Sequence, residues 1–266
     1  MNFLQIERGI SGIQPDVVFR IMGFPISNTT LLLSFIALVI FLFSYFKIRK
    51  FVWNPSKTQA IFEMIYEGIF GLVNQITGSR KLTETILPLI GTLMVFIGLS
   101  NLIGLIVPGL TSITYDGLSI FRTPTSDFNT TLGLAVACIA ITHVASIKDW
   151  GLLGHLGKFF QVKEIYLGFK QSPGAGAMAI VGFLIGLLDV IGEFAKIIAL
   201  SLRLFGNMYA GEVLMVIIFG GLAYALPALW MVMSLLSAVV QTVVFSSLIT
   251  AYYALSVKPS GEVVSG

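Results

Sequence analysis

Two very long apolar segments near the C-terminus restrict the fold more than any other feature of this sequence. The first covers residues 174–221 and the second residues 228–257, with a turn expected at Gly220, Gly221 and Pro227. At 1.5 Å per helical residue, the first would form a helix about 70 Å long. The hydrocarbon core of a bilayer is only about 30 Å thick. The first segment must therefore either tilt steeply or contain a turn that the sequence does not reveal.

Composition identifies the whole chain as a membrane protein. Hydrophobic residues make up 56% of the 266 residues and charged residues only 11%, and the mean hydropathy is +0.93. Soluble domains carry about 25% charged residues. A single cysteine, Cys138, excludes an internal disulfide framework and a CxxC-type metal site. No Walker, dinucleotide-binding or GxSxG motif is present in the sequence, so neither a bound nucleotide nor a hydrolytic site is expected.

Three shorter apolar stretches, together with the two long ones, predict an all-α, polytopic membrane protein. The chain is expected to form one integral membrane domain over residues 1–266. Its expected architecture is one N-terminal span, an interfacial helix on the cytoplasmic side, a helical hairpin and two long, steeply tilted C-terminal helices. The three shorter expected crossings are residues 29–46, 85–107 and 130–147.

Residues 56–79 differ from the crossings, because their apolar side chains occupy one face of a helix. Glu63, Glu67 and Asn74 fall on the opposite face. This pattern is typical of an amphipathic helix that lies along the membrane surface. A soluble helix packed on a neighbouring protein is the alternative.

The distribution of basic residues predicts the sidedness of the chain, since loops rich in Lys and Arg stay in the cytoplasm. The loop between the second and third crossings, residues 108–129, has Arg122 as its one basic residue. The N-terminus is therefore expected outside and the C-terminus in the cytoplasm. Because the basic residues flank apolar segments, the net charge of +3 does not indicate a nucleic-acid partner. The basic residues expected on the cytoplasmic side are Lys47, Arg49 and Lys50, and Lys148, Lys158, Lys163 and Lys170.

Five charged residues interrupt the first long segment: Asp189, Glu193, Lys196, Arg203 and Glu212. An ionised side chain at the centre of a bilayer costs about 2.5–3.5 kcal/mol even on the mildest scale, and such residues mark ion pathways by default. Arg203 is the most informative of them, because a guanidinium cannot lose its proton to escape this cost. It has no acidic residue three or four positions away, so its counter-charge must come from elsewhere.

Helical geometry divides these charges between two faces. At about 100° per residue, most of them lie within about 40° of one line, whereas Glu212 lies about 140° away. Along the helix axis, Glu212 is about 13 Å from Arg203 and Asp189 is about 21 Å away in the other direction. A simple pore would line one continuous face, so this arrangement favours two separate half-paths. The residues on the shared line are Asp189, Glu193, Lys196, Arg203 and Asn207.

Several of these residues also have a purely structural interpretation. Glu193 and Lys196 have the spacing of an ordinary ion pair within a helix. On the following helix, Ser234, Ser237 and Gln241 share one face. Gln241 on this face could lie near Arg203. Alternatively, these polar residues serve only to hydrogen-bond neighbouring helices to one another. His143 and His155 lack metal-ligand spacing and are expected to be structural or solvated.

The run Ser-Leu-Arg-Leu-Phe-Gly-Asn-Met-Tyr-Ala-Gly-Glu at residues 201–212 resembles the signature segment of the a subunit of the F-type ATP synthase. Residues 100–108 resemble the second spanning segment of that family, and residues 124–132 resemble the start of its next one. These matches occur in the family's order. The resemblance covers nearly the whole chain.

The resemblance implies a non-catalytic subunit in which two tilted helices curve around a rotating ring of c subunits. Each ring carboxylate takes up an ion, expected to be a proton, from one half-channel and releases it into the other. Arg203 corresponds to the arginine that meets this carboxylate and prevents a direct leak. Glu212 corresponds to a group of the outer half-channel and Asp189 to one of the inner half-channel. Asn207 and Gln241 correspond to polar residues near the arginine.

The implied partners are the c-ring, the peripheral-stalk b subunit and the lipid bilayer of a bacterial inner membrane, with no cofactor, metal, nucleic acid or nucleotide bound by this chain. Two residues depart from the family pattern. Ser234 stands where some relatives have a histidine that partners the acid at position 212, so water would carry the ion there. Asp189 stands where glutamate is usual.

Two other functions fit part of this pattern. In a secondary transporter, Arg203 would bind an anionic substrate, although the sequence lacks the internal repeats of that class. In a non-conducting scaffold subunit, the charges would only pair with one another.

Overall fold

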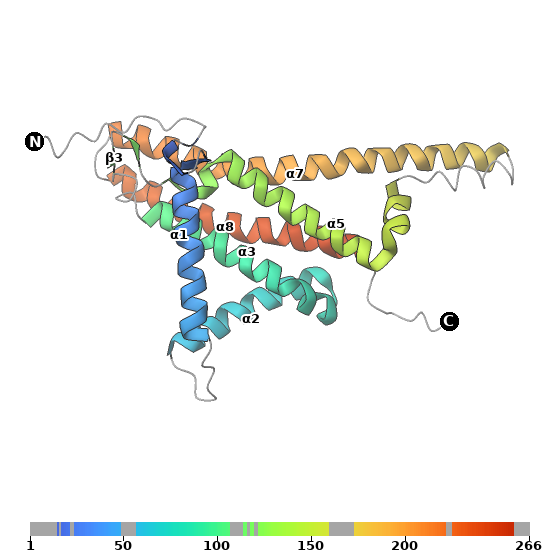
Figure 1. Cartoon of the computed structure of the whole chain (residues 1–266), viewed down its shortest axis with the longest axis horizontal. Coiled ribbons are helices and arrows are strands. Elements are labelled where there is room, and N and C mark those ends of the chain that lie inside the picture. Colours follow the sequence, from blue (N-terminus) through green and yellow to red (C-terminus); the bar gives the residue numbers. More distant parts are fainter. Residues whose placement is uncertain are drawn as a thin grey trace, which may run out of the picture.

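The computed structural model describes residues 15, 17–21, 24–48, 57–106, 114–115, 118–119, 122–159, 173–221 and 225–257. Within these residues the chain is a bundle of long helices with two small hairpins (Figure 1). Five helices are long and apolar enough to cross a membrane. The fold is therefore all-α and polytopic, as predicted. The helices are α1 (Asn28–Phe43), α2 (Lys57–Thr77), α3 (Arg80–Ile106), α5 (Phe128–Phe159), α7 (Pro173–Gly221) and α8 (Ala225–Ser256).

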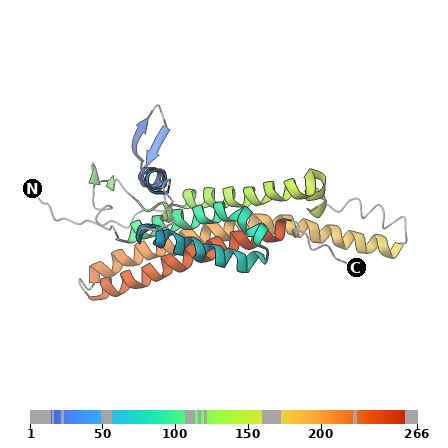
Figure 2. The same cartoon turned by 90° about the horizontal axis from the view of Figure 1, so that it is seen from below.

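Helix α7 is one uninterrupted helix of 49 residues. The turn that the sequence left open is therefore absent, and a steep tilt is the remaining way to fit this helix to a bilayer about 30 Å thick. Its C-terminal half runs beside α8, whereas its N-terminal part extends beyond the rest of the bundle (Figures 1 and 2). The short helix α1 stands at a steep angle to both. If α1 crosses the membrane upright, α7 and α8 are strongly inclined.

Helix α3 forms the centre of the bundle, where it packs against α8, α2 and α1. Its buried side chains recur at helical spacing, which produces one continuous apolar stripe. Cys138 is buried in the same core as a free thiol. The main buried residues are Ile86, Ile90, Leu93 and Ile97 of α3, Ala135, Cys138 and Ile139 of α5, Leu200 and Leu204 of α7, and Phe245 and Ile249 of α8.

Helix α2 packs on α3 and α8 through a face that includes the fully buried Val73. Its N-terminal half also exposes apolar side chains, among them Ile61, Met64 and Tyr66. It is not among the five helices that are apolar enough to span a membrane. A helix with this distribution suits the boundary between lipid and water.

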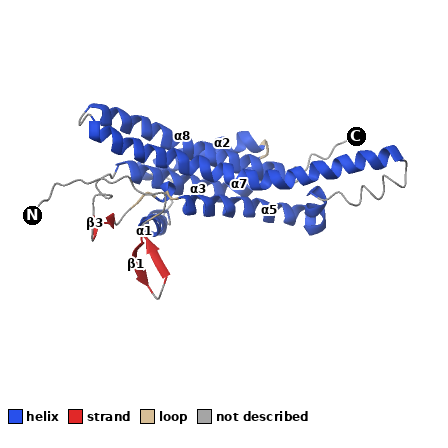
Figure 3. Cartoon of the chain, turned by 90° about the horizontal axis from the view of Figure 1, so that it is seen from above, coloured by secondary structure: helices blue, strands red, loops and turns tan. Residues whose placement is uncertain are grey.

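Two hairpins were not predicted from the sequence. β1 (Val17–Ile21) pairs antiparallel with β2 (Phe24–Ser27), and β3 (Thr114–Tyr115) pairs with β4 (Leu118–Ser119). Both lie at the same end of the bundle (Figure 3). The first hairpin leads directly into α1, where Ser27 caps the helix by accepting a hydrogen bond from the Thr30 amide.

Helix α5 continues beyond the predicted end of its crossing at residue 147. At Gly151 the backbone has φ 73° and ψ 163°, and a kinked tail extends from there to Phe159. This is a conformation that essentially only glycine adopts. The turn brings His155 and Phe159 against His143, with ring centroids 5.3 and 6.4 Å from that of His143. The predicted loop is therefore partly helical.

Several residues used to predict sidedness lie outside the described part of the chain. They are Arg49, Lys50, Lys163 and Lys170, together with the C-terminal tail from residue 258 onward.

We expect Gly151→Ala to destabilise the protein by about 1–3 kcal/mol, because alanine is strained at this φ and ψ. Gly157→Ala is the matched control, since it lies in the same tail and an added Cβ there meets nothing within 4 Å. Alanine at 157 should be neutral or stabilising by up to about 1 kcal/mol. The midpoint of thermal unfolding of the detergent-solubilised complex distinguishes the two. Equal midpoints would contradict the assigned turn.

Candidate functional site along α7 and α8

Arg203 is exposed on the surface of α7 and has no hydrogen-bond or ion-pair partner among the described residues. The Arg203 side chain points away from the bundle because Leu200, Ser201 and Leu204, on another face of α7, are fully buried in it. Asp189 is also exposed, three to four turns toward the N-terminus, and likewise has no such partner in the described part.

The described residues leave the face of α7 that carries Arg203 uncovered. The exposed neighbours of Arg203 include three small residues, Ala199, Gly206 and Ala210, alongside the larger Leu202. Small residues let another helix approach closely, so this face is suited to a partner that packs against it.

Two hydrogen bonds set the register between α7 and α8. Ser237 Oγ donates to Asn207 Oδ1 at 2.8 Å, and Trp230 Nε1 donates to the Gly211 carbonyl at 3.3 Å. Because the helices run antiparallel, this register brings Gln241 to the level of Arg203. Ser237 therefore links the two helices through its hydrogen bond to Asn207.

Gln241 does not hydrogen-bond to Arg203 in the described part of the chain. It is buried, and its Nε2 has no hydrogen-bond partner among the described residues, whereas Arg203 faces outward. Ser234 is half-buried one turn before Ser237. The structure thus brings Asn207 and Ser237 together and leaves Arg203 separate from both polar residues of α8.

Glu212 is half-buried near the C-terminal end of α7, where it lies beside Arg122, Thr123 and Ser126. These three belong to the segment 122–127, which includes a short 3-10 helix and is buried throughout. Arg122 Nη2 donates to the Ser126 carbonyl at 3.3 Å. A buried guanidinium therefore stands beside the Glu212 carboxylate, which lowers the cost of holding a charge there.

The 122–127 segment is tied to three helices. Asp127 caps α5 by accepting a bond from the Asn129 amide at 3.0 Å, and it also accepts one from Thr29 of α1 at 3.2 Å. Thr125 Oγ1 donates to Asn101 Oδ1 of α3 at 2.7 Å. In the other direction, Asn101 Nδ2 reaches Thr242 of α8 at 3.5 Å. Hydrogen-bonded polar side chains thus extend from the 122–127 segment, at the level of Glu212, through Asn101 to Thr242, the residue next to Gln241.

This buried segment was missed by the sequence analysis, which assigned residues 108–129 to an outer loop. The available signal was the run of hydroxyl residues before α5, ending in Asp127 at the position that caps a helix. Hydroxyl-rich sequences are also common in solvated loops. Sequence alone therefore does not distinguish the two.

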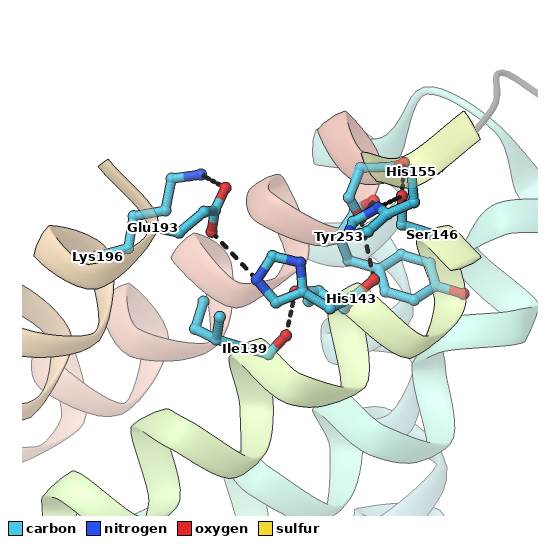
Figure 4. A network of polar contacts seen from close by, with 9 residues as sticks. Ile139, His143, Ser146, His155, Glu193, Lys196 and Tyr253 are labelled. Atoms are coloured by element: carbon cyan, nitrogen blue, oxygen red, sulfur yellow. Dashed lines mark hydrogen bonds and ion pairs between the residues drawn. The ribbon is translucent and has the colours of Figure 1, made fainter. Parts of the chain in front are cut away.

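A second group of ionisable residues lies where α5 meets the first half of α7 (Figure 4). Glu193 Oε1 accepts a bond from Lys196 Nζ at 2.7 Å, so the ion pair considered for these residues is confirmed. The other oxygen, Oε2, lies 3.6 Å from His143 Nε2. This contact between α5 and α7 was not predicted. Among the described residues, no group of three His, Cys, Asp or Glu is arranged to hold a metal ion.

We expect Thr125→Val to destabilise the protein by about 1 kcal/mol, because the buried Asn101 amide would lose its donor. Thr92→Val is the matched control: Thr92 is exposed on the same helix as Asn101 and bonds only to a backbone carbonyl. Its effect should stay below about 0.5 kcal/mol. Thermal unfolding of the purified complex measures both. A larger loss for Thr92→Val would argue against a structural role for the Thr125 contact.

Comparisons with known proteins agree with this architecture. A model of the ATP synthase A chain family matches residues 29–254. ATP synthase subunit a of Desulforamulus reducens is 32% identical over 89% of this chain and 82% of the relative, and that of Moorella thermoacetica is 30% identical over 91% and 96%. A sodium-ion-specific subunit a from Propionigenium modestum is 30% identical over 89% of this chain and 76% of the relative. This integral membrane protein therefore belongs to the ATP synthase A chain family.

Proposed function

We propose that this chain is the ion-translocating stator subunit of the membrane sector of an F-type ATP synthase. It provides two offset half-channels to the carboxylates of a rotating ring of c subunits, and Arg203 prevents a direct leak between them. The observation that carries this proposal is the exposed Arg203, which has no ion-pair partner among the described residues and lies on a face of α7 that those residues leave uncovered. The subunit itself catalyses no reaction.

A permanent cation at this position needs a negative partner. Exposure of Arg203 to lipid alone would cost several kcal/mol, and the described residues supply no acid within reach. A carboxylate on a neighbouring chain removes this cost when it is ionised. The same attraction favours release of the ion that the carboxylate carries, which is the step required for transfer into an exit path.

The two half-channels are assigned to opposite ends of α7. The outer one contains Glu212, Ser234 and the buried 122–127 segment, and the inner one contains Asp189 and Glu193. Asn207 and Gln241 lie near the level of Arg203 between them. Water is expected to carry the ion past Ser234, and the ion is expected to be a proton.

The exposed face of α7 is proposed to pack against the c-ring, and the peripheral-stalk b subunit is a further partner. The chain is placed in a bacterial inner membrane, with its N-terminus outside, its C-terminus in the cytoplasm and α2 at the cytoplasmic surface. The unbroken α7 counts against a secondary transporter, because such proteins bind substrate at interrupted half-helices.

We expect Arg203→Ala to abolish ATP-driven ion pumping by the assembled complex in vesicles while its partner chains still copurify. The reason is that the ring carboxylate loses the fixed cation that forces release of its ion. Arg80→Ala is the control, since Arg80 is exposed and pairs with Glu84 near the start of α3. Its pumping should be unchanged. Normal coupled pumping by the Arg203 variant would refute the proposal.

The proposed ring surface predicts a second result. Gly206→Leu adds a bulky side chain where a Cβ meets nothing within 4 Å, so this chain should fold normally, while close approach of a ring helix is blocked. We expect a severalfold loss of ATP-driven pumping. Gly133→Leu on α5 is the matched control, because it is exposed and equally free of neighbours. Equal activity of both variants would show that lipid, not a partner, covers the Gly206 face.

A further inference from the structure

Four ionisable side chains meet where α5 packs on the first half of α7 (Figure 4). We refer to His143, His155, Glu193 and Lys196 as the His143 cluster. All four members stand in helices long and apolar enough to span the membrane, where an ionisable group normally has a function. His143 has no role in the mechanism described so far.

The Glu193 carboxylate is shared between two helices. One oxygen is held by Lys196 at 2.7 Å on its own helix, and the other faces His143 Nε2 at 3.6 Å across the α5–α7 contact. Lys196 is itself held over the ring of Tyr252, 5.0 Å from its centroid. With Lys196 already neutralising Glu193, the imidazole can gain or lose a proton without leaving an unpaired negative charge.

A cavity of about 350 Å³ lies beside this pair, between α5 and α7. Its walls are apolar, with side chains such as Val136, Ile197 and Phe194, and the two ionisable residues that line it are His143 and Glu193. The volume is larger than a single water molecule needs, and a water molecule is held only where it finds polar partners. Any water there has its strongest hydrogen-bonding partners at one place, the His143–Glu193 pair.

The kinked tail of α5 holds the imidazole in place. His155 is buried, its Nδ1 lies 2.9 Å from Ser146 Oγ, and its ring packs edge-on against that of His143. Phe159 packs against both histidines and lines the cavity. The turn at Gly151 thus closes one side of the site and restricts the orientation of the His143 ring.

We propose that His143 is a proton-transfer residue of the inner half-channel, an inference that rests on the function proposed above. A proton that leaves the ring carboxylate near Arg203 passes through water to the His143–Glu193 pair. Imidazole Nε2 takes it up, forming imidazolium next to the Glu193 carboxylate, and then returns it to water in the cavity on the way to Asp189. Imidazole suits this step because one ring nitrogen can accept a proton while the other keeps its own.

The position along α7 fits such an intermediate station. Glu193 lies ten residues before Arg203, about 15 Å along the axis, and four residues after Asp189, about 6 Å. The two acids are separated by one helical turn, whereas Arg203 stands several turns away. The pair therefore divides the inner path into a long segment and a short one.

The experiment measures the ATP-driven build-up of membrane potential by the whole complex in vesicles, with the same pH on both sides. We expect His143→Ala to lower the initial rate about tenfold or more. Because the variant enlarges an existing cavity, added imidazole should restore the rate at least about threefold, whereas thiazole, a ring of similar size but much weaker basicity, should not. Val136→Ala is the matched control; it enlarges the same cavity without removing an ionisable group, and should neither lose rate nor respond to imidazole.

Each other outcome overturns a specific claim. An unchanged rate in His143→Ala, or equal effects of imidazole and thiazole, would overturn the proton-transfer role and leave the proposed function intact, provided that Arg203→Ala still loses coupling. Retained coupling in Arg203→Ala would instead refute the proposed function. If neither His143→Ala nor the more conservative His143→Gln assembles with its partner chains, His143 is a structural residue and the inference is wrong.

Discussion

The structure depends on how the inward face of α7 packs. Leu200 and Leu204 are fully buried against the core that α3, α5 and α8 provide, and this burial fixes the rotation of α7 about its axis. Arg203, one position from Leu204, consequently faces away from the bundle. A rotation that hid Arg203 would expose this apolar contact and place an unpaired guanidinium inside the core, which is far more costly than its position on the surface.

Polar residues inside the bundle obey the same rule, since groups removed from water need partners. The 122–127 segment satisfies its polar groups through Thr29, Asn101 and its own backbone. At the other end, Glu193 divides its two oxygens between Lys196 and His143. The chain therefore contains two polar regions that are each internally bonded. Between them, Arg203 has no ion-pair partner among the described residues.

Sequence reasoning predicted the features that depend on helical periodicity. The charge pattern of α7 follows from 100° per residue, and the Glu193–Lys196 pair follows from their spacing. The contacts between segments far apart in the chain were not predictable in this way. His143 meets Glu193 because α5 packs against α7. His155 and Phe159 reach His143 because Gly151 turns the tail of α5, and no periodic pattern encodes either contact. The burial of Arg122 and Asp127 was missed for a related reason, because a polar segment before a helix looks the same whether water or protein surrounds it.

The continuity of α7 has a mechanical consequence. A helix whose backbone hydrogen bonds are uninterrupted resists bending and axial compression, so α7 is stiff along its whole length. Force applied sideways at Arg203 by a moving partner would be passed to α5 and α8, which pack against α7, and not absorbed at a hinge. If the proposed ring moves past it, such a helix would keep Arg203 at a constant height, which two shorter helices joined by a hinge would not do.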